Sequence, residues 1–205
     1  MNLRQRYALD SWQRVANRVC FANRPGEVDL ISNVDVATVT LFDADNPPSL
    51  RQLAEHAASL GGPDPIAISN SDIVIHPRIL RIFRVLEVNP FEEWAATGPR
   101  WTVESFYDMG SASITDWGLD VFLAPSGVWK RVANDVPQFL CLGSTLWDNW
   151  LNGWFGHNLR TYINMQPWKC MFHERHESTA TNPYTPEQSA SLTFPFNGLP
   201  PMQFK

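Results

Sequence analysis

The 205-residue sequence predicts an α/β fold in which strands alternate with helices. Short runs rich in Val, Ile and Thr alternate with stretches whose apolar residues recur at helical spacing. Clusters of Gly, Pro, Asn and Asp punctuate the chain between these segments. The hydrophobic fraction of 44% is that of a globular protein with a sizeable core. In such a fold parallel strands are expected, and ligands bind at their carboxyl ends.

The N-terminal part of the chain contains two predicted helices and two predicted strands. Residues 2–17 carry apolar side chains at helical spacing and predict an amphipathic helix. Strands are expected over 18–21 and 36–41, which are short and apolar or rich in Val and Thr. Ser49 is a candidate N-cap for a second helix, and glycines 61–62 end that helix.

The next part of the chain continues the alternation and then becomes irregular. Strands are predicted over 65–69 and 73–75, with the polar residues 70–72 between them. Pro77 begins a further helix, because proline suits the first helical turn. Residues 89–115 are aromatic and irregular, and no regular element is expected there.

The C-terminal part of the chain is expected to add further elements and a tail. In order, these are a strand at 121–124, an apolar segment at 136–143, a Trp-rich helix at 144–154 and short strands at 162–165 and 168–172. Residues 178–205 are rich in Ser, Thr, Pro and Asn. They predict an extended tail that wraps the domain or is partly disordered.

The composition excludes several classes of protein. No apolar run approaches the roughly 20 residues of a membrane helix, and no apolar stretch follows the basic N-terminus as in a secretory signal. The three cysteines are far apart and lack metal-site spacing, which is typical of reduced thiols in a cytoplasmic protein. The formal net charge of −5 argues against a broad basic surface for nucleic acid.

Three polar residues, Asn70, Ser71 and Asp72, directly follow a predicted buried strand. A carboxylate at a strand end is suited to Mg²⁺ or Mn²⁺, which prefer oxygen ligands and take further ones from phosphates. The same residue types also form ordinary turns, because their side chains bond to nearby backbone. Both interpretations remain open from the local residues alone.

Two histidines, His173 and His176, follow a predicted strand in the segment His-Glu-Arg-His-Glu. Histidines three residues apart face the same way on a helical turn and opposite ways in an extended strand. One imidazole would complete a metal site begun by Asp72, and the alternative is a solvated strand end. The spacing is one residue short of the H-E-x-x-H pattern, so a zinc protease is excluded.

A Trp-rich segment surrounds Asp148, in a chain that contains nine Trp. A carboxylate beside indoles serves as a general base when apolar surroundings raise its pKa. Indoles also suit the CH face of a sugar. The alternative is a helix whose Trp147, Trp150 and Trp154 pack in the core, with Asp148 favoured by the helix dipole. The two interpretations are compatible.

Six motifs occur in one order along the chain. They are Ala8-Leu-Asp-Ser-Trp12, Ala67-Ile-Ser-Asn-Ser-Asp72-Ile-Val, Trp117-Gly-Leu-Asp120-Val-Phe, Val136-Pro-Gln-Phe139, Gly143-x-x-x-Trp147-Asp-Asn-Trp-Leu151 and His173-Glu-Arg-His176. Together they resemble a family of GT-A-fold glycosyltransferase-like proteins, the nucleotide-diphospho-sugar transferases. The match covers about residues 5–177, and Trp-Asp-Asn-Trp-Leu is its most specific string. The resemblance implies a GT-A-like, Rossmann-like single domain over 1–177, with a mixed, mostly parallel sheet flanked by helices.

The resemblance implies a donor site that contains a metal ion. Asp72 would bind Mn²⁺ or Mg²⁺ on the diphosphate of a nucleotide-sugar donor such as a UDP-sugar. His173 or His176 would complete the metal site, and Asn70 and Ser71 would lie beside the donor. The metal would offset charge on the leaving nucleoside diphosphate.

The resemblance also implies an acceptor side. Asp148 would deprotonate the acceptor hydroxyl as general base. Asp120 and Trp147 would line the acceptor site. Trp101 and Trp94, in the irregular segment, are expected to face a bound sugar. The acceptor is expected to be a glycan or small molecule, and no membrane span is expected.

Three departures from the family pattern motivate a second hypothesis. Members usually begin with a strand that holds the nucleotide base, whereas Met1 stands almost at the start of the first predicted helix. Ser144 and Glu174 occupy positions where the family has Arg and Gln. The second hypothesis is therefore a catalytically degenerate protein of the same fold that binds a carbohydrate or nucleotide.

A third hypothesis is a glucosyltransferase that acts on modified DNA bases, because some enzymes of that kind share the fold. It requires a local basic groove on an acidic protein. The residues available for such a groove are Arg78, Arg81, Arg84, Lys130 and Arg131.

Overall fold

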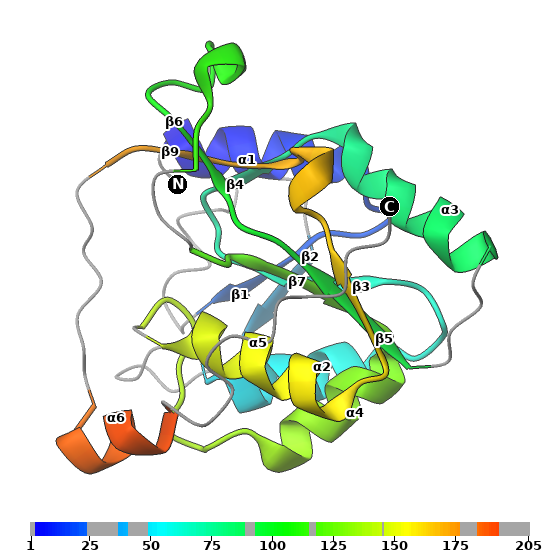
Figure 1. Cartoon of the computed structure of the whole chain (residues 1–205), viewed down its shortest axis with the longest axis vertical. Helices are drawn as coiled ribbons and strands as arrows, with labels where there is room; N and C mark the ends of the chain where they lie inside the picture. The colour runs from blue at the N-terminus through cyan, green and yellow to red at the C-terminus, as the bar shows by residue number, and fades with distance from the viewer. Residues whose placement is uncertain are drawn as a thin grey trace.

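A four-stranded sheet with the strand order β3-β7-β5-β8 forms the centre of the computed structural model (Figure 1). Its strands are Ile66–Ser69 (β3), Val121–Ala124 (β7), Trp94–Thr97 (β5) and Thr161–Asn164 (β8). β7 runs antiparallel to both of its neighbours, whereas β5 and β8 are parallel. The structure describes residues 3–23, 37–40, 49–88, 93–114, 118–144, 146–176 and 184–192, which make up one mixed α/β domain.

Two smaller sheets accompany the central one. Ile73–Ile75 (β4), Met171–Glu174 (β9) and Trp101–Val103 (β6) form the order β4-β9-β6, and Cys20–Asn23 (β1) pairs with Ala37–Thr40 (β2). β1 and β2 are parallel, as are β6 and β9, whereas β4 and β9 are antiparallel. Among the described residues, parallel and antiparallel strand pairs are therefore equally frequent, and the expectation of a mostly parallel sheet is wrong.

The direction of the strands follows from short links without helices. β3 passes to β4 through residues 70–72, and β5 passes to β6 through residues 98–100. A parallel neighbour in the same sheet requires a crossover of a dozen or more residues. These links are too short for such a crossover, so consecutive strands cannot be parallel neighbours in one sheet, and in this structure each pair is divided between the two sheets.

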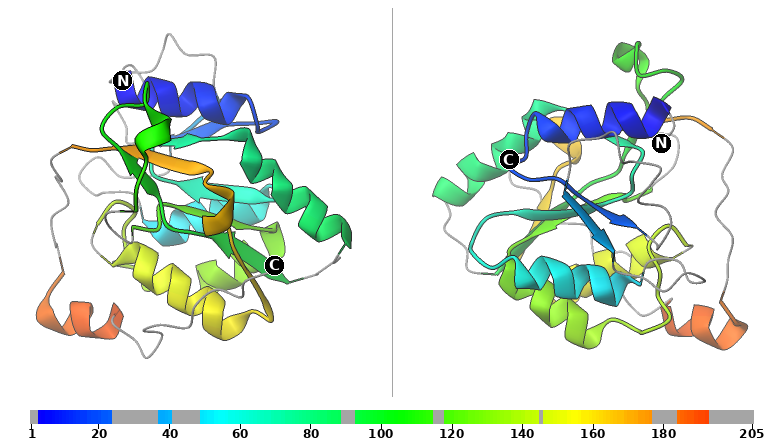
Figure 2. Two further views of the ribbon diagram at one scale, coloured as in Figure 1. Left: turned by 45° about the horizontal axis from the view of Figure 1, so that its top comes forward. Right: turned by 180° about the vertical axis from the view of Figure 1, so that it is seen from behind.

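Helices cover both faces of the central sheet (Figures 1 and 2). One face carries Leu50–Ser59 (α2), Ser126–Asp135 (α4) and Trp147–Asn158 (α5), and the other carries Leu3–Gln13 (α1), the 3₁₀ turn Pro77–Leu80 (η2) and Arg81–Val88 (α3). Phe122 and Ala124 of β7 point to the first face, and Val121 and Leu123 point to the second. The central strands are therefore buried on both sides.

Four elements differ from the sequence-based expectations. β5 and β6 lie in the segment that was expected to be irregular, and no element was expected where α4 forms. Part of the expected extended tail is the helix Pro186–Leu192 (α6), which begins with a capping box between Thr185 and Gln188. Leu192 is buried in the main core. The rest of that tail lies outside the described residues.

No helix among the described residues has both the length and the apolar character needed to cross a membrane. Cys20, Cys141 and Cys170 are free thiols. Burial raises the pKa of Cys170 to about 12, so its thiol is unreactive at neutral pH.

Candidate metal centre and cavity

Three links of the chain meet at one edge of the central sheet. They are residues 70–72 after β3, residues 98–100 after β5 and residues 118–120 before β7. The ends of β3 and β5 both pair with the start of β7, which brings the three links together. The first two links lead directly into the three-stranded sheet, so this edge is the junction between the two sheets.

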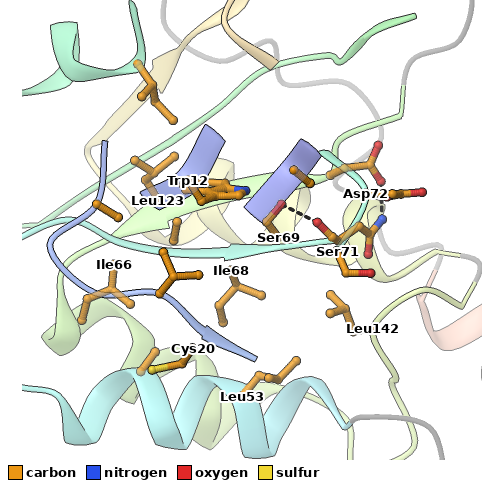
Figure 3. A pocket seen from close by; sticks show the side chains of 18 of the residues that line it. Trp12, Cys20, Leu53, Ile66, Ile68, Ser69, Ser71, Asp72, Leu123 and Leu142 are labelled. Atoms are coloured by element: carbon orange, nitrogen blue, oxygen red, sulfur yellow. Dashed lines mark hydrogen bonds between the residues drawn. The ribbon is translucent and has the colours of Figure 1, made fainter. Parts of the chain in front are cut away.

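A cavity of about 1370 Å³ lies along this junction. Its polar lining includes Asn70, Asp72, Arg100, Thr102, Asp120, Asp148, His173 and His176. The remainder is largely apolar and comes mainly from α1, α2, β3, η2 and α3, although Arg18, His56 and Asp64 also line it. Figure 3 shows Asp72 at one end, with Trp12, Ile68 and Leu53 along the apolar part. The cavity therefore offers a charged end and an apolar arm to one ligand.

Asp72, His173 and His176 form a compact group at the charged end. Nε2 of His173 and Nε2 of His176 are 3.1 Å apart, and Oδ2 of Asp72 lies 3.2 Å from the His176 nitrogen and 3.4 Å from the His173 nitrogen. β9 ends at Glu174, and the two imidazole rings lie against each other with centroids 4.8 Å apart. The structure thus brings together all three predicted metal ligands from two distant segments.

The three donor atoms fit one metal ion. Two ligands about 2.1 Å from an ion and at right angles are about 3 Å apart, which is the spacing found here. Two imidazoles and one carboxylate would hold a divalent cation that could bind a further ligand. Imidazole ligands suit transition-metal ions, whereas Mg²⁺ prefers oxygen, so of the two expected ions Mn²⁺ fits this set better.

The carboxyl group of Asp72 is held in its ionised form. Burial acts to raise its pKa, but hydrogen bonds with His173 and His176 and the charge interaction with His173 outweigh it. The net result lowers the pKa of Asp72 to about 2. A ligand to a divalent cation must be deprotonated, and Asp72 meets this condition at any pH near neutral.

Helix α1 contacts residues that neighbour the triad in the chain. Arg4 pairs with Glu174 at 2.9 Å, and Glu174 also accepts the backbone N–H of Phe106. Gln5 donates to the hydroxyl of Ser71 at 3.2 Å. Glu174, at the position where the family has Gln, is thus bonded to α1 and points away from the face of His173, as alternation along a strand requires.

Asp120 links two other groups of the cavity wall. Its side chain, 7% exposed, accepts hydrogen bonds from Nδ2 of Asn70 and Nη1 of Arg100, each at 2.6 Å. Burial raises the pKa of Asp120, although the charge and hydrogen bond of Arg100 oppose this. In this structure the carboxylate positions Asn70 and Arg100, and its expected contact with an acceptor remains a prediction.

Sequence reasoning did not identify Arg100. Its guanidinium passes directly over Gly118, where an added Cβ would lie 2.8 Å from Cζ of Arg100. Glycine in the Trp117-Gly-Leu-Asp120 motif therefore makes room for this arginine. The signal in the sequence was Gly118 two residues before Asp120. That Arg100 is the partner of Asp120 follows only from the link between β5 and β6 in the structure.

Asp148 lies in the first turn of α5 and lines the same cavity. Its carboxylate accepts the backbone N–H groups of Leu119, at 3.3 Å, and Asn149, at 2.9 Å. Burial raises the pKa of Asp148, with a further contribution from the charge of Asp120, while the two N–H bonds act in the opposite direction. A carboxylate with a raised pKa is suited to accepting a proton.

The tryptophans divide between cavity and core. Trp147 belongs to the core and is 3% exposed, and it also borders the cavity and packs edge-on against Phe122. Trp150 and Trp154 stack on each other in the core. Trp94 is also in the core, and the ring of Trp101 lies under Nζ of Lys169 at 4.7 Å.

The structure does not bring Trp94 or Trp101 to the cavity, contrary to the expectation that they face a bound sugar. Trp101 alternates with Arg100 and Thr102 along the chain, so its side chain points to the other face of β6. Trp94 belongs to β5, a strand whose residues are buried on both faces of the sheet, and its side chain lies in the core. Trp117 lies outside the described residues.

The basic residues of the DNA hypothesis do not form one groove. Arg78, Arg81 and Arg84 belong to η2 and α3, whereas Lys130 and Arg131 belong to α4 on the opposite face of the central sheet (Figure 1). Arg131 pairs with Glu93 at 2.9 Å.

Compared with known proteins, the chain matches no family model, no curated protein and no solved structure. The geometry of the cavity and the resemblance of its motifs are therefore the grounds for a functional assignment.

Proposed function

We propose that this protein is a metal-dependent glycosyltransferase of the reducing cytoplasm. It transfers a sugar from a nucleotide-diphosphate donor to a hydroxyl group of a glycan or small molecule. The observation that carries the proposal is the triad of Asp72, His173 and His176, which shares one cavity with the partly buried carboxyl group of Asp148.

The triad is the donor end of the proposed site. Its three ligand atoms would hold Mn²⁺, and when bound the ion offsets the charge of the leaving nucleoside diphosphate. Asn70, held by Asp120, is placed beside Asp72 on the same link and is suited to hydrogen-bond the donor. Arg4 and Gln5 of α1 support the triad from the far side.

Asp148 is the proposed general base. Two backbone N–H groups orient its carboxylate, and burial keeps its proton affinity high. As the acceptor oxygen forms its bond to the anomeric carbon, the hydroxyl proton passes to Asp148 and the bond to the diphosphate oxygen breaks. Trp147 offers an apolar surface next to this carboxylate for the acceptor or the sugar.

The apolar part of the cavity supports the proposal that the donor contains a nucleoside. A metal ion and a diphosphate fill only part of a cavity of about 1370 Å³, which exceeds the size of many small-molecule sites. Trp12, Leu53 and Ile68 provide a surface on which a planar base is favourably buried. The arm is continuous with the triad, so one extended ligand reaches both.

The alternative is a catalytically degenerate protein of the same fold that binds a carbohydrate or nucleotide. Ser144 favours it, because its hydroxyl bonds to the carbonyl of Cys141 where the family pattern has a long cationic side chain. DNA as acceptor is disfavoured by the separation of the basic residues described above.

The test is sugar transfer and donor hydrolysis by the full chain with Mn²⁺ and a panel of nucleotide sugars. We expect turnover in the wild type, loss of turnover and of metal binding in Asp72→Asn, and loss of turnover with metal binding retained in Asp148→Asn. Asp108→Asn, at an exposed acid outside the cavity, serves as the matched control.

The outcomes separate the hypotheses. Metal-dependent nucleotide binding by the wild type without turnover would establish the binding protein instead. Absence of both binding and turnover would overturn the proposal. A requirement for Fe²⁺ and O₂ would assign the triad to iron chemistry, which uses the same ligand set.

A further inference from the structure

We propose that Arg100 and Thr102 form a phosphate-binding subsite beside the metal triad. The inference deepens the proposed function and rests on it for the identity of the ligand, a nucleoside diphosphate. The subsite itself is argued from strand geometry, from a buried hydroxyl and from the placement of one guanidinium.

The strand register places these residues on the face of the triad. β6 and β9 are parallel, and Thr102 pairs with His173. Paired residues in adjacent strands point to the same face of a sheet, so the side chain of Thr102 lies on the side of the His173 imidazole. Arg100 precedes Thr102 by two positions and shares that face. All three line the cavity.

The hydroxyl group of Thr102 has no hydrogen-bond partner among the described residues, although the residue is only 6% exposed. Buried polar groups are paired in nearly all proteins, and an unpaired one is costly. Both backbone groups of Thr102 are satisfied by Ser113. The hydroxyl therefore requires a partner that enters the cavity, and a phosphate oxygen accepts a hydrogen bond from it.

Arg100 is positioned in advance. Asp120 holds Nη1, and the missing side chain of Gly118 gives the guanidinium its path along the wall. Arginine binds phosphate through a planar fork of N–H donors, which a fixed guanidinium presents with little loss of entropy. A neutral sugar hydroxyl would not need this charge.

The charged lining of the cavity restricts where an anion can bind. Its acids are Asp64, Asp72, Asp120 and Asp148, and its arginines are Arg18, Arg100 and Arg175, the last of which pairs with Glu104. An anion therefore binds only where a cation offsets the acids, as Arg100 does beside Thr102. Because Thr102 is adjacent to His173, a diphosphate is long enough to reach the subsite with one phosphate and the triad with the other.

The test is calorimetric titration of the full chain with inorganic pyrophosphate and with orthophosphate, each with EDTA and with Mn²⁺. We expect pyrophosphate to bind the metal-free wild type and to bind more tightly with Mn²⁺. Thr102→Val, Arg100→Lys and Gly118→Ala should each weaken metal-free binding by about tenfold, the effect of one charged hydrogen bond. Gly118→Ala displaces the guanidinium without removing it.

Two matched controls separate the subsite from general effects on the fold. Thr97→Val removes a buried hydroxyl that donates to the carbonyl of Val121 outside the cavity, so it should lower the melting temperature and leave pyrophosphate binding unchanged. Thr102→Val should weaken pyrophosphate binding and leave the melting temperature unchanged, because its hydroxyl has no such partner to lose. Arg131→Lys, outside the cavity, should not affect binding.

Equal metal-free affinities for wild type, Thr102→Val and Arg100→Lys would overturn the subsite, as would no binding of either anion to the wild type. Orthophosphate binding as tight as pyrophosphate binding, with no gain from Mn²⁺, would identify free phosphate as the ligand. Intact binding without sugar transfer would refute the proposed function alone and leave the subsite standing.

Discussion

Asp72 and Asp148 are two carboxyl groups of one cavity whose environments shift their pKa values in opposite directions. Two imidazoles lower the pKa of Asp72 to about 2, whereas burial raises the pKa of Asp148. Opposite shifts of neighbouring carboxyl groups are how one site provides both a permanent anion and a proton acceptor. The local sequence indicated the two residue types, but not the imidazoles and backbone N–H groups that surround them.

We predict that Asp148→Asn stabilises the protein at neutral pH while activity falls by about 10²- to 10⁴-fold, the range for loss of a general base. A pKa raised in the folded state means that folding favours the protonated carboxyl group. The contribution of Asp148 to stability is therefore fully present below its unfolded pKa and is lost as the pH rises through its folded pKa.

The measurement is the melting temperature of both proteins from pH 3 to 8. Asn cannot ionise, so Asp148→Asn should melt above the wild type at pH 7, and the difference should shrink toward pH 4. A variant that melts below the wild type at pH 7 would show that Asp148 is needed for folding.

We also predict that Asp120→Ala destabilises the protein by about 3–5 kcal/mol, because it removes the buried carboxylate that accepts hydrogen bonds from Arg100 and Asn70. The control is Glu104→Ala, which breaks the exposed pair with Arg175 and should cost under about 1 kcal/mol. Urea denaturation of both variants measures the two values. Equal costs would mean that the buried pair adds nothing beyond an exposed one.

At the scale of elements, the sequence predicted those with a clear period or a plain apolar run and missed those without either. α2 was predicted because its apolar residues recur at helical spacing, and β4 because Ile73-Val-Ile75 is a short apolar run after a polar break. β5 reads Trp-Ala-Ala-Thr, and because it is buried on both faces it shows no alternation. α6 was missed although Thr185-Pro-Glu-Gln188 is a capping-box sequence, since its Ser- and Pro-rich surroundings suggested a tail.

We predict that Thr185→Ala loosens α6 and costs about 1 kcal/mol, because it removes the hydroxyl that accepts the N–H of Gln188. Hydrogen exchange of the α6 amides should increase, while Mn²⁺ binding stays unchanged because the helix contributes no residue to the described lining of the cavity. Ser189→Ala, on the same helix but outside the box, is the control. Equal exchange in both variants would exclude the capping box as the anchor.

At the scale of the whole molecule, the α/β class followed from the sequence and the sheet directions did not. Alternation of element types is a local property, whereas strand direction depends on which distant strands pair. The three metal ligands were first grouped by residue type and then by the resemblance of the motifs, not by spacing, since about a hundred residues separate Asp72 from His173. Arg100 and Thr102 remained hidden because their common face with His173 exists only in the register of β6 against β9.

The triad is the centre of this account, and the affinity of the full chain for Mn²⁺, measured by electron paramagnetic resonance of the free ion, tests it most directly. The account predicts one site in the wild type that Asp72→Ala and His176→Ala each weaken by at least about tenfold, since loss of an outer-shell partner alone already costs about that much. It predicts unchanged affinity in Asp148→Asn. An affinity for Mn²⁺ that is the same in the wild type and in Asp72→Ala would contradict it.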